Sequence, residues 1–233
     1  DSDLPVLRLK PKADARRIRH GHPWAWADDL VLDRRTRKIP PGVLAILEDA
    51  GREPLGVGVA TVGARIGFRL LDRDASARID GEWLRARLRA ALDLRERAFD
   101  APYYRLVHAE GDGLPGLIAD RFDDTIVVQP NAIWLEERLD DTRDLLVDLT
   151  GARRIVKNGT SRARAAEGLP EEMSVLLGEP PDGPLDVPMN GAVYKADVMG
   201  GQKTGLFFDQ RDNHAFAARL ARDARVLDVF SHV

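Results

Sequence analysis

The sequence of 233 residues contains no cysteine. Disulfide bonds and thiolate metal sites are therefore excluded within these residues, and none of them can act as a thiol nucleophile. No apolar run approaches the roughly 18 residues of a membrane span. The segment Asp1–Pro5 also lacks the basic-then-apolar pattern of a signal peptide. We therefore expect a cytoplasmic protein with no membrane partner and no bound metal.

What the chain does contain is typical of a folded protein, with 44% hydrophobic and 31% charged residues. Its length allows one large domain or two smaller ones. A net charge of −3 does not by itself call for a nucleic-acid partner. Residues 1–40, however, carry ten Lys or Arg against six Asp. A locally basic segment can attract phosphate, although a solvated charged face would have the same composition.

Residues 4–72 form a β-rich unit. Short apolar or alternating runs predict strands, and the polar residues 48–52 predict a hairpin turn. One helix is predicted at residues 13–20. The predicted strands cover residues 6–10, 43–47, 54–60 and 64–70.

The rest of the chain alternates between helices and strands. Leucines 84, 88 and 92 form an apolar stripe at helical spacing, which predicts an amphipathic helix at residues 81–99. A polar pair at 123–124 predicts a β-hairpin turn, and Gly151 is placed to end a helix. Further helices are expected at residues 133–149 and 210–222. Further strands are expected at residues 104–108, 117–122, 125–129, 154–157, 174–177, 193–197 and 206–208.

The last residues, 225–233, have the pattern of a buried strand that ends in polar residues. A nucleotide-binding α/β domain opens in this way, and such a strand needs neighbours on both sides and helices on both faces. Nothing after Val233 supplies them. We therefore expect this chain to be a fragment of a larger protein.

Two glycine-rich segments fail as phosphate-binding loops. Residues 111–116 match the dinucleotide pattern literally, but a β-hairpin is expected after them where a helix is required. A tight turn between strands explains them better. Residues 200–204 resemble a P-loop, but Gln202 stands where a glycine is needed before Lys203.

Two other segments allow a functional and a structural interpretation. Trp24 and Trp26, beside His20 and His22, could stack on bases, or one could lie in the core and the other cap a loop. In the segment 207–213, Asp209 is a predicted N-cap. Gln210 and Arg211 would then either begin an ordinary capped helix or point into a cleft at the edge of the next strand.

Three segments in this order resemble one family. They are Glu110–Phe122, Gly201–Asn213 and Arg225–Ser231. Together they are similar to the class I S-adenosylmethionine-dependent methyltransferases that make 5-methylcytosine in large-subunit (23S) ribosomal RNA. The resemblance spans essentially the whole chain.

The resemblance implies an α+β fold followed by the start of an α/β domain. Residues 1–75 would form a PUA-like β-barrel that binds RNA. Residues 76–185 would form a central α+β domain that holds the substrate. Residues 186–233 would begin an incomplete Rossmann-like methyltransferase domain.

The resemblance also implies site residues for two ligands, S-adenosylmethionine and ribosomal RNA. His232 departs from the aromatic residue that the family usually has at that position. By this match, the cofactor-binding residues are Phe208, Gln210, Arg211, Asp228 and Ser231. The RNA-binding residues are Lys10, Arg17, Arg19, His22, Trp24 and Arg69.

The implied reaction is covalent. A cysteine thiolate attacks C6 of cytosine, C5 takes the methyl group, and a base removes the C5 proton. Because these residues contain no cysteine, the catalytic residues would lie after Val233, and this chain alone is expected to be inactive. A non-catalytic RNA-binding module of PUA type is the alternative. A guanine or protein acceptor, and the oligomeric state, with a homodimer as one option, stay open.

Overall fold

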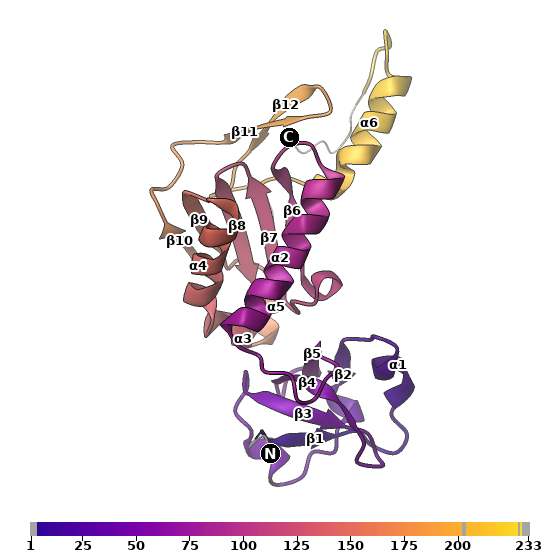
Figure 1. The fold of residues 1–233 in the computed structure, drawn as a ribbon. Helices are drawn as coiled ribbons and strands as arrows, with labels where there is room; N and C mark the ends of the chain where they lie inside the picture. Colours follow the sequence, from indigo (N-terminus) through magenta and orange to yellow (C-terminus); the bar gives the residue numbers. More distant parts are fainter. Residues whose placement is uncertain (1–3, 202–203, 228, 230–233) are drawn as a thin grey trace.

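The computed structural model describes residues 4–201, 204–227 and 229. Its described residues form two five-stranded sheets, one after the other along the chain, followed by a two-stranded hairpin and a final helix (Figure 1). Helices and strands alternate without a continuous parallel sheet, so the described fold is of the α+β class.

The N-terminal domain contains the first sheet, in the order β1-β3-β4-β5-β2. Only β1 and β3 pair in parallel. The sheet bends around a core to which Leu7, Leu47 and Phe68 contribute fully buried side chains. The strands are β1 (Val6–Arg8), β2 (Trp24–Trp26), β3 (Leu44–Glu48), β4 (Pro54–Ala60) and β5 (Ile66–Asp72); the helices are α1 (Ala15–Arg19), η1 (Ala27–Asp29) and η2 (Thr36–Lys38).

The central domain contains the second sheet, in the order β10-β9-β8-β7-β6, with only β8 and β9 in parallel. The helix α2 begins at a cap, because the Asp80 carboxylate accepts a hydrogen bond from the backbone N–H of Trp83. The strands are β6 (Tyr103–His108), β7 (Leu117–Phe122), β8 (Thr125–Pro130), β9 (Arg154–Asn158) and β10 (Met173–Leu177); the helices are α2 (Gly81–Ala98), η3 (Ala109–Asp112), α3 (Ile133–Glu136), α4 (Leu139–Thr150) and α5 (Arg162–Ala166).

The second sheet is covered on both faces. Ile126 and Val128 point to the core under α2 and α4, whereas Val127 points to the opposite face. This alternation is the two-residue period of a strand buried on both sides. The hairpin of β11 (Leu185–Met189) and β12 (Ala192–Ala196) covers the second face, together with Val198, Leu206 and Phe208.

Most of the predicted elements are confirmed with small shifts of their ends. The predicted helix at 133–149 is the main exception in the central domain, because the structure divides it into α3 and α4. Trp134 is fully buried and donates a hydrogen bond from Nε1 to the Pro115 carbonyl at 3.0 Å. This contact holds α3 at one end of the sheet, while α4 packs beside α2. The strand β11 is an element that the sequence analysis did not predict.

The segment before the last helix also differs from prediction. Residues 206–208 form no strand, and Phe208 begins the 3₁₀ turn η4 (Phe208–Gln210). Its ring instead packs against Phe122, with ring centroids 5.2 Å apart. Asp209 is not the N-cap either, since α6 (Arg211–Leu220) begins after η4 and its cap position is Gln210. The apolar run is thus buried by ring packing and not by strand pairing.

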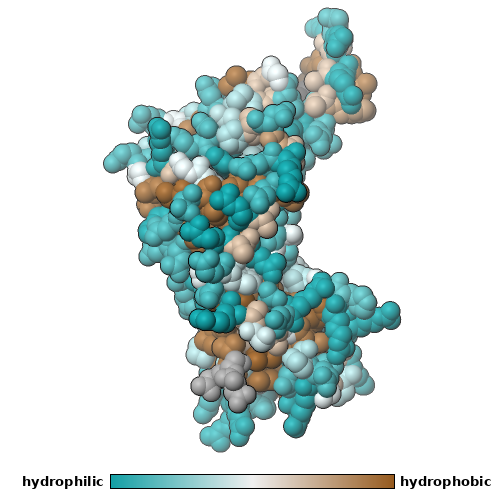
Figure 2. Space-filling model, viewed as in Figure 1, coloured by the Kyte–Doolittle hydropathy of each residue, from teal (hydrophilic) through white to brown (hydrophobic). Residues whose placement is uncertain are grey.

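The expected buried strand at 225–233 is not found in the described residues. Residues 225–227 have no regular structure, and Val226 and Leu227 are 68% and 86% exposed. A buried strand needs strand neighbours and covering helices, which the described residues do not place there. In the space-filling view α6 stands clear of the body of the molecule with apolar side chains on its surface (Figure 2), among them Phe216 and Leu220.

Candidate functional site

A cavity of about 340 Å³ lies where η4 and the start of α6 meet the central domain. It brings together two of the predicted cofactor residues, Phe208 and Arg211, whereas Gln210 lies beside them on η4 without lining it. Asp228 and Ser231 lie outside the described residues. The cavity is lined by Arg95, Phe99, Tyr104, Arg105, His108, Phe208, Asp209 and Arg211.

Arg211 is the central cation of this cavity. Its guanidinium carbon lies 4.6 Å from the ring centroid of Phe99 and 5.7 Å from that of Phe208. One terminal nitrogen donates to the backbone carbonyl of Tyr103. Its Nε is buried without a hydrogen-bond partner among the described residues. Burial lowers the pKa of Arg211, and the nearby Asp212 carboxylate only partly offsets this effect.

The floor of the cavity is held rigid by ion pairs. Arg105 donates to both carboxylate oxygens of Asp120, at 2.9 and 3.0 Å, and Asp120 is fully buried. Burial lowers the pKa of Arg105, but the hydrogen bonds and charge of Asp120 outweigh it, so the net shift is upward. The Thr204 hydroxyl also donates to Asp120. Two-point pairing of this kind fixes the orientation of a guanidinium.

The same wall carries a second two-point pair. Arg95 on α2 donates to both oxygens of Asp112, at 2.5 and 2.8 Å. The cavity therefore combines aromatic rings with fixed guanidinium groups. Such walls suit a flat heteroaromatic ring, and Arg211, which pairs with no carboxylate among the described residues, is the cation left for a negatively charged group. The sequence analysis missed Phe99, Tyr104 and Arg95, although the strand pattern that places Tyr104 and Arg105 on opposite faces of β6 was visible.

The predicted RNA residues of the N-terminal domain are spread around α1 and β2. Lys10 donates to the Asp28 carbonyl at 2.8 Å, and Arg19 pairs with the Asp49 carboxylate. The Lys10 and Arg19 side chains are both on the surface. Arg17 and His22 lie in hydrogen-bond contact at 2.9 Å. Burial and the Arg17 charge, in that order, lower the pKa of His22, which favours its neutral form.

Trp24 is half-buried at the junction of the two domains. Its ring makes edge contacts with His22 and Trp26, at centroid distances of 5.9 and 5.6 Å. Its Nε1 donates to the Glu110 carboxylate at 2.8 Å. Neither of the two earlier interpretations is complete, because this tryptophan is neither a free stacking surface nor a core residue.

The expectation that Arg69 binds RNA is corrected by its surroundings. Arg69 is buried, and its guanidinium donates to Glu110 at 3.3 Å and to Glu167 at 2.7 Å. A guanidinium that is already bound by two carboxylates does not offer a free cation to phosphate. Arg69 joins the N-terminal domain to the central domain. The sequence analysis missed both acidic partners, because the separations of 41 and 98 residues leave no local pattern.

The described residues contain neither a helix suited to span a membrane nor a group suited to bind a metal. None of the helices in the described ranges is both long and apolar enough to cross a membrane. In the same part of the chain, no group of three or more His, Asp or Glu side chains is arranged to hold a metal ion.

Comparison with known proteins finds similarity along the whole chain. Residues 7–73 match the family model of a PUA-like domain. A ribosomal RNA large subunit methyltransferase of Deinococcus radiodurans is 33% identical over 99% of this chain. A ribosomal RNA large subunit methyltransferase I of Alteromonas mediterranea is 32% identical over 96% of it. The chain spans 58% and 56% of the lengths of these two relatives.

Solved structures share the fold. A candidate S-adenosylmethionine-dependent methyltransferase from Streptococcus mutans matches with a TM-score of 0.74 over 91% of this chain and 54% of its own, at 15% identity. A second matching structure, with the same TM-score and identity, covers 91% of this chain and 53% of its own; it is a candidate methyltransferase in complex with S-adenosylhomocysteine. The described fold is therefore shared with the corresponding half of these proteins.

Proposed function

We propose that this chain holds RNA for the S-adenosylmethionine-dependent methylation of large-subunit ribosomal RNA. One observation carries the proposal. Two relatives named for that activity match 96–99% of the chain at 32–33% identity, with a PUA-like domain at residues 7–73. Because the chain spans little more than half of each relative, the activity is proposed for the complete gene product.

The N-terminal domain would hold the RNA backbone. Lys10, Arg16, Arg17 and Arg19 place cations on one continuous segment around α1, and all are exposed. Cations on a folded surface attract phosphate and release its counterions, which makes the binding depend on salt. Trp24 would support this surface by fixing His22 and the junction with Glu110.

The cavity beside α6 would take part of the cofactor. The buried and unpartnered Nε of Arg211 is a donor available to a ligand oxygen. The rings of Phe99 and Phe208 would pack on a flat group. Phe208 and Arg211 would thus bind and orient S-adenosylmethionine, which supplies the activated methyl group when bound. Gln210, Asp228 and Ser231 are added to this set by the family resemblance alone.

The finer proposal is that the acceptor atom is C5 of cytosine. That reaction needs a thiolate at C6, and residues 1–233 contain no cysteine. The nucleophile would therefore belong to a part of the gene product outside these residues. This chain would bind and position the RNA.

The test measures methyl transfer from tritiated S-adenosylmethionine to protein-free large-subunit ribosomal RNA. We expect labelled 5-methylcytosine with the complete gene product and no label with residues 1–233 alone. Label on another base would overturn the cytosine assignment, and methyl transfer by the isolated 1–233 chain would overturn the placement of the nucleophile. A complete gene product that never labels this RNA would overturn the proposal itself.

The cofactor pocket has its own test. In the complete gene product, Arg211→Ala is expected to weaken cofactor binding about tenfold in calorimetry, since it removes a charged donor. Arg219→Ala is the matched control, because Arg219 lies on the same helix over the exposed ring of Phe216. Equal affinity for both variants and the unchanged protein would contradict the assigned pocket.

A second candidate function is RNA binding without catalysis. It is favoured by one observation: the family model that matches residues 7–73 is that of a PUA-like domain, and the exposed cations around α1 lie within those residues. RNA binding by the complete gene product without any methyl transfer would support this alternative over the first.

A further inference from the structure

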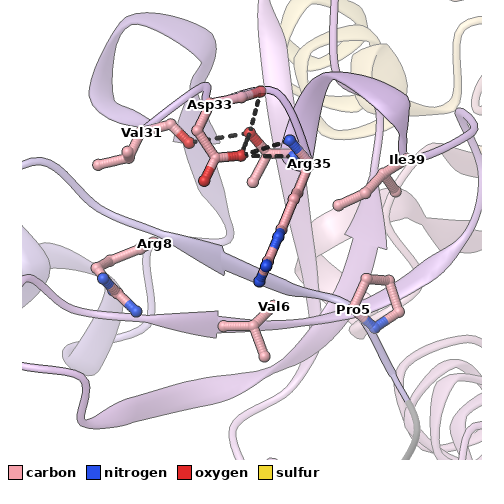
Figure 3. A pocket seen from close by; sticks show the side chains of 8 residues that line it. Pro5, Val6, Arg8, Val31, Asp33, Arg35 and Ile39 are labelled. Carbon is pink, nitrogen blue, oxygen red and sulfur yellow. Dashed lines mark hydrogen bonds between the residues drawn. The ribbon is translucent and has the colours of Figure 1, made fainter.

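The loop between β2 and β3 forms a second pocket in the N-terminal domain, built from residues that the proposed RNA surface around α1 does not use. We call this cavity of about 370 Å³ the loop pocket. Figure 3 shows the Arg35 side chain extending from the loop toward Val6 on β1, with Arg8 and Pro5 on either side. Its walls are aliphatic and its rim is cationic. The pocket is lined by Pro5, Val6, Arg8, Val31, Asp33, Arg35, Thr36 and Ile39.

Cations outnumber carboxylates around the loop pocket. Arg34, Arg35 and Lys38 are exposed, and their side chains have no hydrogen-bond or ion-pair partner within the described ranges. Arg37 is held by the Leu32 carbonyl through its Nε at 3.1 Å. Arg8 makes a long contact of 3.3 Å with Glu48 and keeps a side-chain exposure of 38%. Exposed cations gathered beside a hollow attract anions and raise their local concentration there.

The acidic residue of the loop, Asp33, already accepts hydrogen bonds from within the loop. The Asp33 carboxylate accepts hydrogen bonds from the backbone N–H groups of Arg35 and Thr36, both at 2.8 Å, and from the Thr36 hydroxyl at 3.2 Å. The Thr36 backbone hydrogen bond is the largest cause of the lowered pKa of Asp33. This turn fixes the loop, so the pocket exists before any ligand binds. Preformed walls reduce the conformational entropy that the loop must lose when a ligand binds.

We propose that the loop pocket binds one unpaired nucleotide of an RNA strand. The base would lie against Val6, Val31 and Ile39, with the flat Arg35 guanidinium stacked on it. The adjoining phosphates would contact Arg34 and Lys38. Bases that are free of pairing are the ones that proteins splay out and stack on arginine planes. A duplex cannot place a base in this pocket, so the pocket gives the domain a preference for single strands.

This inference rests on the proposed RNA binding, and the experiment separates the two. A fluorescent single-stranded RNA and a duplex of equal length are titrated with the 1–233 chain at several salt concentrations. The Arg34→Glu, Arg35→Glu double variant should bind the single strand about tenfold more weakly. The slope of log affinity against log salt should become shallower by about 0.7 for each lost phosphate contact. Duplex affinity should fall less.

Two controls make the result specific. Arg153→Glu removes one exposed arginine from the loop between α4 and β9, at the end of the central domain far from the N-terminal domain (Figure 1), and should leave single-strand affinity within twofold. Val6→Gln keeps the cations but makes the pocket wall polar at a residue that is 40% exposed. It should weaken single-strand binding about threefold and leave duplex binding unchanged.

Methyl NMR locates the bound base directly. The methyl signals of Val31 and Ile39 should shift when the single strand is added and stay in place with the duplex. If the unchanged chain binds no RNA, the proposed function of the N-terminal domain fails. If it binds RNA, but the double variant binds as well and these methyl signals do not move, the loop pocket is refuted while the α1 surface stands.

Discussion

Arginine is used in opposite ways in two regions of the molecule, the helix α5 of the central domain and the loop between β2 and β3 of the N-terminal domain. In the central domain, Arg164 is fully buried and donates to the carbonyls of Pro130 and Pro170 and to the Glu136 carboxylate. In the N-terminal domain, Arg34 and Arg35 are exposed without partners among the described residues. One residue type thus holds the structure together at a buried position of α5 and is free to bind a ligand in the exposed loop.

The difference follows from the cost of removing a charge from water. A buried guanidinium is tolerated only where carboxylates and carbonyls replace its hydration, and the removal of one partner leaves the other charge uncompensated. An exposed cation contributes little to folding. The buried arginines should therefore affect stability and leave surface binding alone, whereas the exposed ones should do the reverse.

The largest expected effect is that of Arg164→Ala. This change leaves Glu136 with only its Lys157 partner, leaves two carbonyls without their donor and opens a cavity, so we expect a loss of about 3–5 kcal/mol of unfolding free energy. Urea denaturation measures it. Arg162→Ala is the matched control on the same helix, because Arg162 is exposed, and it should change stability by less than about 0.5 kcal/mol. Equal losses of unfolding free energy for both variants would contradict the contrast between buried and exposed arginines.

The second effect is that of Arg69→Ala at the domain junction. Glu110 and the buried Glu167 lose their shared donor, which should cost about 2–3 kcal/mol. The two domains should also become less fixed, which small-angle X-ray scattering detects as a larger radius of gyration. Arg65→Ala, at an exposed position over the Trp26 ring, should change neither property. An unchanged radius for Arg69→Ala would mean that the other contacts, such as the hydrogen bond from Trp24 to Glu110, hold the junction without Arg69.

The smallest effect concerns His22 on the N-terminal surface. Removal of the Arg17 charge by Arg17→Ala should raise the pKa of His22 toward its ordinary value of 6.5, which NMR titration of the imidazole measures. Burial is the larger cause of the lowered pKa, so the rise should be partial. An unchanged titration midpoint of His22 would show that the Arg17 charge does not influence the pKa of the imidazole.

The lowered pKa of His22 also affects the stability of the fold. Because the folded pKa of His22 lies below the unfolded one, the unfolded chain binds more protons near pH 6. The contribution of His22 to stability is therefore present above about pH 6.5 and is lost as the pH falls. Since His22 is partly exposed to solvent, this contribution is small, and His22→Gln should flatten the change of unfolding free energy between about pH 7 and pH 5 only slightly.

Local patterns were sufficient for most elements of the fold. The leucine stripe of α2, the polar pair between β7 and β8, and Gly151 at the end of α4 each determine their element through neighbours a few residues away. Gly151 adopts a φ of +69°, as the helix end requires. The glycine-rich residues 111–116 are likewise a turn before a hairpin, which confirms that they do not precede a phosphate-binding helix.

The failures share a physical cause. A short apolar run such as residues 206–208 can be buried by a partner strand or by packing of its rings. Phe208 is buried by ring packing because the tertiary structure places Phe122 beside it. The residues 225–227 have strand propensity, but no described strand lies beside them. Arg69 occupies a polar position of an alternating strand, where an exposed cation is expected. It is buried instead because Glu110 and Glu167, which are distant in the sequence, pair with it.

By itself, the sequence determined most of the helices and strands, the β-rich N-terminal unit and the absence of a thiol within these residues, because periodicity and composition are local properties. The tertiary structure alone decided which arginines are buried and which are free. It brought Arg211 to Phe99 and Arg69 to Glu167 across long stretches of chain. Burial depends on what the rest of the fold packs against a side chain, and no window of neighbouring residues contains that information.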